Sequence, residues 1–303
     1  MSIDPSGQGW HEVADRVFQR RYQPYDVTVS VVVGSEGLAV VDTRCSLAEA
    51  RELKRDLRQL SAAPVRWVVN THAHFDHVWG NAEFVAPRQR PGAELWGHRA
   101  TAAAMAADAT DPATLAFKER LRSTSDVWAA AMAELEEVVP DRLVDREHTL
   151  DLGDRLVRLR HVGRGHTDGD LLVQIPDADA LLAGDLVEES GPPAFGPDSY
   201  PLEWAGTLDA LLALDGVGPG TVIVPGHGAP VDTGFVREQR TAIASVAARL
   251  TAAHRAGTPL AEVLRDGDWP YSTEGLQHAA ARAYARLDDP EAEAEAEAEA
   301  GAG

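Results

Sequence analysis

THAHFDHVWGN, residues 71–81, contains three histidines and one aspartate within six consecutive positions. The whole chain has 11 histidines in 303 residues, so this density is unusual. The stretch directly follows the apolar run VRWVV (65–69), which is typical of a buried strand. Three imidazoles this close would repel one another if protonated, so a metal ion or an ordered hydrogen-bond network has to keep them neutral. We therefore expect a polar site at the end of a strand.

The residue types in this stretch are ligands for a divalent transition metal. In extended chain, side chains at positions i and i+2 share a face, so His72 and His74 can bind one cation. A turn at Phe75 would direct Asp76 and His77 toward an adjacent point. Imidazole and carboxylate suit Zn²⁺, and also Fe, Mn or Co. Two such ions about 3.5–4 Å apart need a bridging group, for which a carboxylate such as Asp185 is well suited.

Further histidines and aspartates recur where strand-like runs stop. They are Asp42 after LAVV, His72 after VRWVV, His166 after RLRHV, Asp185 after ALLA and His227 after TVIV. Strand ends at one rim of a sheet can bring such residues together from distant parts of the chain. His98 and His161 also lie near strand ends, but neither belongs to a cluster, and we expect packing roles for both.

Strand-like and helical segments alternate, which predicts a mixed α/β domain of layered sheets and helices. The expected strands are 27–33, 38–41, 65–69, 93–97, 143–146, 149–151, 155–162, 171–175, 180–185 and 221–225. The expected helices are 46–60, with Ser46 and Glu49 forming a capping box, 101–137 with a break near 110–112, 207–215, 233–256 and 259–266. We expect one domain over residues 1–287, with 101–137 as a helical insertion.

Composition excludes several classes of protein. Hydrophobic content of 44% and charged content of 25% are ordinary for a globular chain. No run of about 18 apolar residues predicts a membrane span, and the first residues do not resemble a secretory signal, so we expect a cytoplasmic protein. The net charge of −20 argues against nucleic acid as a partner. Seven of the acids lie in residues 288–303, which we expect to be a disordered acidic tail.

Several motifs together resemble those of the metallo-β-lactamase superfamily. HAHFDH (72–77) is similar to its HxHxDH signature, and GHT (165–167), GD (184–185) and PGHG (225–228) are similar to its later motifs in the same order. Asp42 in VVDT resembles the family's aspartate after the second strand. The resemblance covers roughly residues 27–230. It implies an α/β (α+β) fold, a four-layer αββα sandwich with a metal site along one edge of the paired sheets.

The resemblance also implies which residues bind metal. One ion would be held by His72, His74 and His166, and a second by Asp76, His77 and His227. Asp185 would bridge the two ions, and Asp42 would orient a ligand histidine by a hydrogen bond. Two Zn²⁺ ions per chain are expected, with Fe or Mn as alternatives.

The expected reaction is hydrolysis by a metal-bound hydroxide, with Asp76 as the catalytic residue that orients the hydroxide or shuttles a proton. The substrate would be a small molecule containing an ester, thioester, lactone or lactam bond. A β-lactamase, a mononuclear iron oxygenase resembling persulfide dioxygenases, and a non-catalytic binding protein are alternatives. No basic cluster for a glutathione carboxylate is evident near the C-terminus. The sequence predicts no oligomeric state.

The substrate pocket is expected to involve the loop at 191–204. This loop follows Asp185, is rich in proline and glycine, and contains Tyr200 and Trp204. These aromatic residues could line the pocket or could cover the edge of the sheet. The helical stretch 101–137 could likewise form a lid with Trp128 facing inward, although packing is the simpler interpretation.

Overall fold

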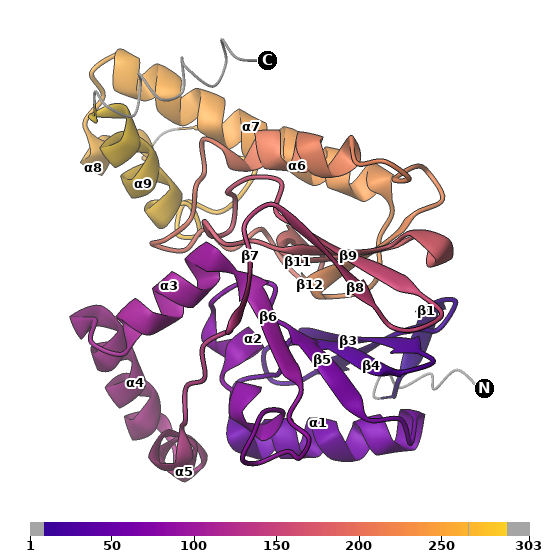
Figure 1. The fold of residues 1–303 in the computed structure, drawn as a ribbon. Coiled ribbons are helices and arrows are strands. Elements are labelled where there is room, and N and C mark those ends of the chain that lie inside the picture. The colour runs from indigo at the N-terminus through magenta and orange to yellow at the C-terminus, as the bar shows by residue number, and fades with distance from the viewer. Residues whose placement is uncertain (1–8, 266, 290–303) are drawn as a thin grey trace.

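The computed structural model describes residues 9–265 and 267–289. Within these residues the strands form one twelve-stranded sheet in the order β7-β6-β5-β4-β3-β12-β11-β10-β9-β8, with β1 pairing β2 and β2 pairing β3. At the centre of this order β3 and β12 are joined only by the pair His227 and Val27. The sheet divides there into two facing layers, with helices outside each layer (Figure 1). The expected αββα sandwich is confirmed.

The first layer contains the N-terminal strands and the helix that covers them. Its strands are β1 (His11–Ala14), β2 (Val17–Tyr22), β3 (Val27–Gly34), β4 (Gly37–Val41), β5 (Val65–Val69), β6 (Glu94–His98) and β7 (Arg142–Val144). Helix α1 (Leu47–Leu60) begins at Ser46, whose side chain accepts a hydrogen bond from the backbone N–H of Glu49. Strands β4 to β7 run parallel, so their carboxyl ends meet at one rim.

The second layer is built from the C-terminal half of the described chain. Its strands are β8 (Glu147–Asp151), β9 (Leu156–Arg160), β10 (Leu172–Ile175), β11 (Ala180–Glu188) and β12 (Val222–His227). Its helices are α6 (Trp204–Leu212), α7 (Thr233–Arg255), α8 (Leu260–Val263) and α9 (Gln277–Leu287). Strands β11 and β12 run parallel, so Asp185 and His227 lie toward the same rim.

Three apolar interfaces hold the four layers together. Val41, Val69 and Leu159 belong to the cluster between the two sheet layers. Leu53 of α1 packs on the outer face of the first layer, and Leu208 of α6 on that of the second. These side chains are buried almost completely, and each such burial contributes roughly 1.5–3 kcal/mol.

The expected helical stretch 101–137 consists of α3 (Arg99–Asp108), α4 (Pro112–Thr124) and α5 (Asp126–Glu134). Neither α4 nor α5 contains a fully buried residue. The half-buried rings of Phe117 and Trp128 pack against Phe75, which lies in the short helix α2 (Phe75–Val78) beside the candidate site. The 3-10 turns η1 (Asn81–Glu83) and η2 (Pro176–Ala178) complete the elements.

The structure differs from expectation in several places. Strands β1 and β2 and helix α9 were not predicted, and the helix expected at 259–266 is the single turn α8. Strand β11 continues past Asp185 to Glu188, with a register shift at Gly184, which has a φ of 53°. Glycine adopts this left-handed conformation without strain, so the strand can bulge there and continue.

Of the expected acidic tail, residues 290–303 lie outside the described residues, while Asp288 and Asp289 follow α9. Among the described helices, none combines the length and the apolar character that crossing a membrane requires.

Candidate metal centre

The structure brings all seven sequence-predicted donors together at one rim of the sheet layers. His72, His74, His166 and Asp185 form one group, and Asp76, His77 and His227 form a second. Within each group the potential ligand atoms lie within 4.8 Å of one another. The donors come from the loop after β5, from α2, from the loop between β9 and β10, and from β11 and β12.

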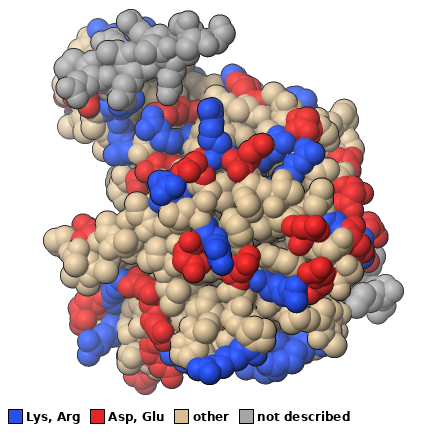
Figure 2. All heavy atoms as spheres, in the orientation of Figure 1, with Lys and Arg blue, Asp and Glu red and all other residues tan. Residues whose placement is uncertain are grey.

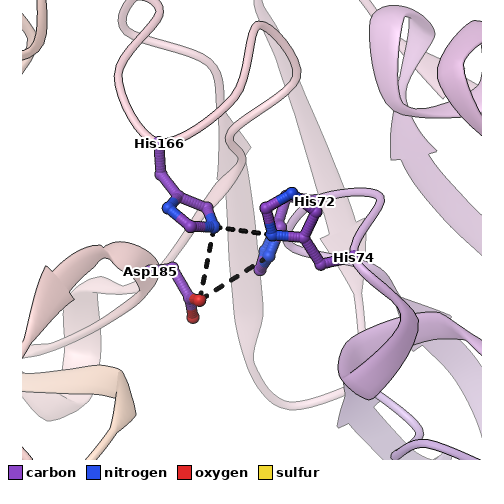
Figure 3. Close-up of side chains that lie close together, drawn as sticks. All are labelled: His72, His74, His166 and Asp185. Carbon is purple, nitrogen blue, oxygen red and sulfur yellow. Dashed lines mark hydrogen bonds and ion pairs between the residues drawn. The ribbon is translucent and has the colours of Figure 1, made fainter. Parts of the chain in front are cut away.

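In the first group the donor atoms point toward one centre (Figure 3). Nε2 of His166 lies 2.8 Å from Nδ1 of His74 and 3.4 Å from Oδ2 of Asp185. Nε2 of His72 lies 3.7 Å from the same Asp185 oxygen. Three imidazole nitrogens and one carboxylate thus surround a common point, an arrangement that suits a four-coordinate Zn²⁺ ion.

The second group is similarly close. Nε2 of His77 lies 3.3 Å from Nε2 of His227 and 3.7 Å from Oδ2 of Asp76. Asp185 also reaches this group, because its Oδ1 lies 3.3 Å from Nε2 of His77 and its Oδ2 lies 3.4 Å from Nε2 of His227. The Asp185 carboxylate therefore contacts donors of both groups, as a bridging ligand would.

The nitrogen of each imidazole that faces away from the cluster is hydrogen bonded to the protein. These contacts pair Nδ1 of His72 with Oγ1 of Thr71 (3.0 Å), Nε2 of His74 with Oδ2 of Asp198 (3.0 Å), Nδ1 of His77 with Oδ2 of Asp42 (2.8 Å), Nδ1 of His166 with the Ala194 carbonyl (3.0 Å) and Nδ1 of His227 with the Tyr25 carbonyl (2.8 Å). Such bonds fix the ring and its tautomer, so that the other nitrogen can coordinate. His74 is the one ring of the five that turns Nδ1 inward.

Two buried atoms at the centre lack hydrogen bonds. Nε2 of His72 and Oδ1 of Asp185 are both buried without a hydrogen-bond partner. Leaving a buried polar atom unsatisfied costs about 1–3 kcal/mol. His72 Nε2 belongs to the first donor group and Asp185 Oδ1 faces the second, so cations in the two groups would satisfy both atoms, and the donor set fits metal ions.

The electrostatics of the cluster agree with a cation-binding role. Burial is the largest single effect and alone would lower the pKa of His77 and of His227, but the surrounding carboxylates, Asp185 first among them, together outweigh it and raise the two values to about 9 and about 11. Burial lowers the pKa of His166 to about 4. Protons on His77 and His227 therefore balance the carboxylates, and a bound cation would supply that positive charge in their place.

The sequence did not single out two carboxyl groups beside the centre. Asp198 lies half-exposed in the loop after β11. Its partial burial raises the pKa of the carboxyl group, but the hydrogen bond with His74 and the charge of that ring lower the pKa of Asp198 to about 2. Burial and the Asp185 charge raise the pKa of Glu188 to about 8. Neither residue belongs to a recognisable motif, and only the tertiary fold brings Asp198 to His74, 124 positions away.

The two expected pocket aromatics, Trp204 and Tyr200, lie in different surroundings. Trp204 is fully buried and donates a hydrogen bond from Nε1 to the Leu186 carbonyl, which places it in the core beneath His166 rather than on a pocket wall. The physical reason is that Trp204 begins α6 and packs that helix onto the sheet. Tyr200 is half-buried and lines a different cavity.

His98 and His161 belong to neither donor group. Their rings stack with centroids 4.0 Å apart. Nε2 of His98 bonds the Asp145 carbonyl, and Nδ1 of His161 bonds that of Asp170. These contacts are those of packing residues.

A family model described as the metallo-beta-lactamase superfamily matches residues 22–227. The chain belongs to this superfamily. The match covers almost the same part of the chain as the resemblance of the motifs, and it includes all seven candidate donors.

Curated relatives show what this chain is similar to. The proteins named acyl-coenzyme A thioesterase MBLAC2 from human and from Bos taurus are 28% and 30% identical over 207 residues, covering 65% of this chain and 71% of theirs. The metallo-beta-lactamase type 2 of Bacillus cereus is 26% identical over 204 residues, covering 67% of each chain. A metal-dependent hydrolase acting on a small molecule is the class of enzyme that these relationships support.

Solved structures of similar fold agree. The sec-alkylsulfatase Pisa1 from Pseudomonas sp. has a TM-score of 0.71 at 18% identity and covers 93% of this chain, which spans 50% of that chain's length. A metallo-beta-lactamase from Pontibacter korlensis has a TM-score of 0.59 at 20% identity, covering 77% of this chain and 97% of its own. At these identities the likeness concerns the fold.

Proposed function

We propose that the protein is a dinuclear, zinc-dependent thioesterase that hydrolyses acyl thioesters of a small thiol. The observation that carries the dinuclear part is the position of Asp185, whose carboxylate contacts donors of both groups. The thioester part is supported by the acyl-coenzyme A thioesterases among the relatives. In this proposal His72, His74 and His166 hold one ion, Asp76, His77 and His227 hold the other, and Asp185 lies between them.

When bound, such a pair of ions lowers the pKa of coordinated water toward 7, supplies a nucleophile at neutral pH and polarises the thioester carbonyl. Asp76 lies beside His77 and His227 and can orient the attacking water and accept its proton. A thiolate has a conjugate-acid pKa of about 8.5, so it departs without a strong general acid.

A nucleophilic side chain is not needed for this chemistry. Cys45, the single cysteine, is buried, and burial raises the pKa of its thiol well above its usual range. A neutral, inaccessible thiol cannot attack a substrate. The reaction therefore depends on the rim that carries the metal donors.

The surface charge agrees with a small-molecule substrate rather than nucleic acid. Acidic and basic side chains are intermixed over the face that Figure 2 shows. With a net charge of −20, phosphate backbones would be repelled.

The sequence left two alternative activities, a mononuclear iron oxygenase and a β-lactamase. A mononuclear iron oxygenase would bind its single ion in one donor group. The other group, Asp76, His77 and His227, would then hold no metal ion. A β-lactamase has support from relatives at 26% identity.

One experiment separates these functions. Metal content of the purified protein is measured, and the zinc-, iron- and manganese-loaded forms are then assayed with matched acyl thioester, oxygen ester, lactone and β-lactam substrates. Oxygen uptake with a persulfide is measured in parallel. The proposal predicts about two Zn²⁺ per chain and the highest kcat/KM with the thioester. Preferential lactam cleavage, or iron-dependent oxygen consumption, would replace it.

A further inference from the structure

A cavity of about 340 Å³ is lined by the loop that follows β11 and by helix α9. Helix α9 contributes two arginines to it, four residues apart and therefore on one face of the helix. The charged and aromatic residues of its lining are Arg164, Tyr200, Glu203, Arg282, Arg286 and Asp289. The arginines converge here from the C-terminal helix and from the loop before His166, and with Glu203 and Asp289 the lining holds three basic and two acidic side chains.

Arg164 and Arg282 differ in the partners of their guanidinium groups. Arg164 donates two hydrogen bonds to Glu203, at 2.7 and 2.9 Å, and its guanidinium lies 4.6 Å from the centroid of the Tyr200 ring. Arg282 donates from Nε to the Ser199 carbonyl at 3.0 Å and lies 5.2 Å from the same ring. Among the residues that the structure describes, no carboxylate forms an ion pair with Arg282. Its charge is thus positioned by a carbonyl and a ring and can be balanced by an anionic ligand.

Two segments of the chain link the cavity lining to the metal centre. Arg164 precedes His166 by two residues, so their Cα atoms lie within about 7–8 Å of each other. Ser199 follows Asp198, whose carboxylate contacts His74. A ligand with one end in this cavity therefore has its other end within reach of the donors, at a distance on the order of 10–20 Å.

We propose that this cavity binds the phosphate-bearing end of the thiol half of the substrate, as in a coenzyme A thioester, with Arg282 as the principal contact. The inference rests on the proposed thioesterase function. A guanidinium forms paired, charge-assisted hydrogen bonds with phosphate oxygens, and stacking on Tyr200 restricts its orientation in advance. The volume is at the lower end of the range for small-molecule sites, enough for a diphosphate group but not for the whole thioester. The extended arm of coenzyme A between phosphate and sulfur spans the remaining distance.

The test compares two substrates with the same acyl group. One is the coenzyme A thioester, and the other is the N-acetylcysteamine thioester, which lacks phosphate. Arg282→Gln and Arg286→Gln are assayed on the zinc-loaded enzyme beside Arg265→Gln. Arg265 is 68% exposed after α8 and gives the same change in net charge outside the cavity.

The expected result is selective. Loss of one charge-assisted contact raises KM for the coenzyme A thioester about 10- to 100-fold. The KM for the truncated thioester changes less than about twofold, kcat changes little for either substrate, and the selective effect weakens at high salt. Arg286→Gln gives an effect in the same direction, and Arg265→Gln gives none.

Other results overturn the inference. An equal loss of kcat on both thioesters would mean that Arg282 only supports the loop carrying Asp198. An unchanged KM for the coenzyme A thioester would show that no phosphate binds there. The glutathione thioester of the same acyl group is assayed in parallel, and a KM that depends on Arg282 for this substrate alone would assign the cavity to a carboxylate.

A binding measurement separates this inference from the proposed function. Titration calorimetry with ADP, on the unmodified protein and on the three variants, requires no turnover. If no thioester is hydrolysed but ADP binding is weakened by Arg282→Gln and not by Arg265→Gln, the thioesterase proposal fails and the phosphate site stands. Absence of ADP binding by the unmodified protein overturns the site itself.

Discussion

Oδ2 of Asp42 lies 2.8 Å from Nδ1 of His77, and both side chains are buried. The same carboxylate accepts hydrogen bonds from the backbone N–H and the hydroxyl of Thr71, each at 2.8 Å. Thr71 Oγ1 in turn contacts Nδ1 of His72. One aspartate therefore orients a histidine in each donor group, directly for His77 and through Thr71 for His72.

Asp42→Asn should lower metal affinity and activity by about 10- to 100-fold, because an amide has one acceptor oxygen for the three donors that the carboxylate serves. The backbone should not change, since asparagine tolerates the φ of 66° at this position. Metal quantification and kcat/KM at limiting zinc provide the measurement. Asp154→Asn, at an exposed carboxylate that pairs with Arg16, is the matched control. Full zinc content and activity in Asp42→Asn would contradict the orienting role.

The donors themselves could be predicted because their motifs stand where strand-like runs of the sequence stop, and parallel strands such as β4 and β5 end at one rim. Asp42 was found for the same reason. Asp198 could not be found this way, because it lies in an irregular loop whose path depends on tertiary contacts such as the bond from Tyr200 N–H to the Gly165 carbonyl. The bulge at Gly184 was also missed, and it allows β11 to continue beyond Asp185.

The arginine-lined cavity shows the same limit. Arg282 and Arg286 can be assigned to one helix face only after α9 is known, and the buried face of α9 is formed mainly by alanines, which are a weak hydrophobic signal in the sequence. Their proximity to Arg164, 118 positions earlier than Arg282, depends on how α9 packs against α7 and the loop after β11. Charge spacing along the sequence contains no such information.

Asp198→Ala should reduce kcat/KM about tenfold through loss of the hydrogen bond to Nε2 of His74. The effect should be smaller than at Asp42, because Asp198 is half-exposed and water can replace it as acceptor. Asp198→Asn retains an acceptor oxygen and should recover part of the loss. Steady-state kinetics with zinc quantification tests this order of activities. Equal activity of the alanine variant and the unmodified enzyme would show that His74 needs no such partner.

Zinc uptake by the metal-free protein should release protons at pH 7.5. His77 and His227, with pKa values raised to about 9 and about 11, are protonated at this pH without metal. Ligation requires neutral imidazole, so about two protons leave on binding. Apparent zinc affinity should therefore fall in acid and rise with pH, most steeply below about 9 and less steeply from there to about 11. Titration calorimetry in two buffers of different ionisation enthalpy counts the protons.

The control for proton release is His148→Gln, since His148 is exposed and lies outside both donor groups. This variant should release the same number of protons as the unmodified protein. Proton uptake, or no proton exchange at all, would contradict the charge balance inferred for the metal-free centre.

Cys45 should be resistant to alkylation in the folded protein. Its side chain is buried, and burial raises the pKa of the thiol, so the reactive thiolate is scarce at pH 8. Iodoacetamide should modify it at least about 100-fold more slowly in buffer than in concentrated guanidinium chloride. Mass spectrometry over time measures both rates. Rapid native labelling would show that the thiol is accessible and would reopen a nucleophilic role.

Gly184→Ala should destabilise the protein and lower the amount of zinc that the metal centre binds. The left-handed conformation at this position is strained for alanine, and the new Cβ would lie 2.8 Å from Cβ of Thr71. The hydroxyl of Thr71 links Asp42 to His72 by hydrogen bonds. The free energy of unfolding should fall by about 1–3 kcal/mol, and zinc content should fall with it.

Gly206→Ala is the matched control, because nothing lies within 4 Å of a Cβ in that helical position. Alanine there should leave stability unchanged or raise it by up to about 1 kcal/mol. Urea unfolding and zinc quantification on both variants measure the difference, and equal stability with full zinc in both would show that Gly184 does not position Thr71.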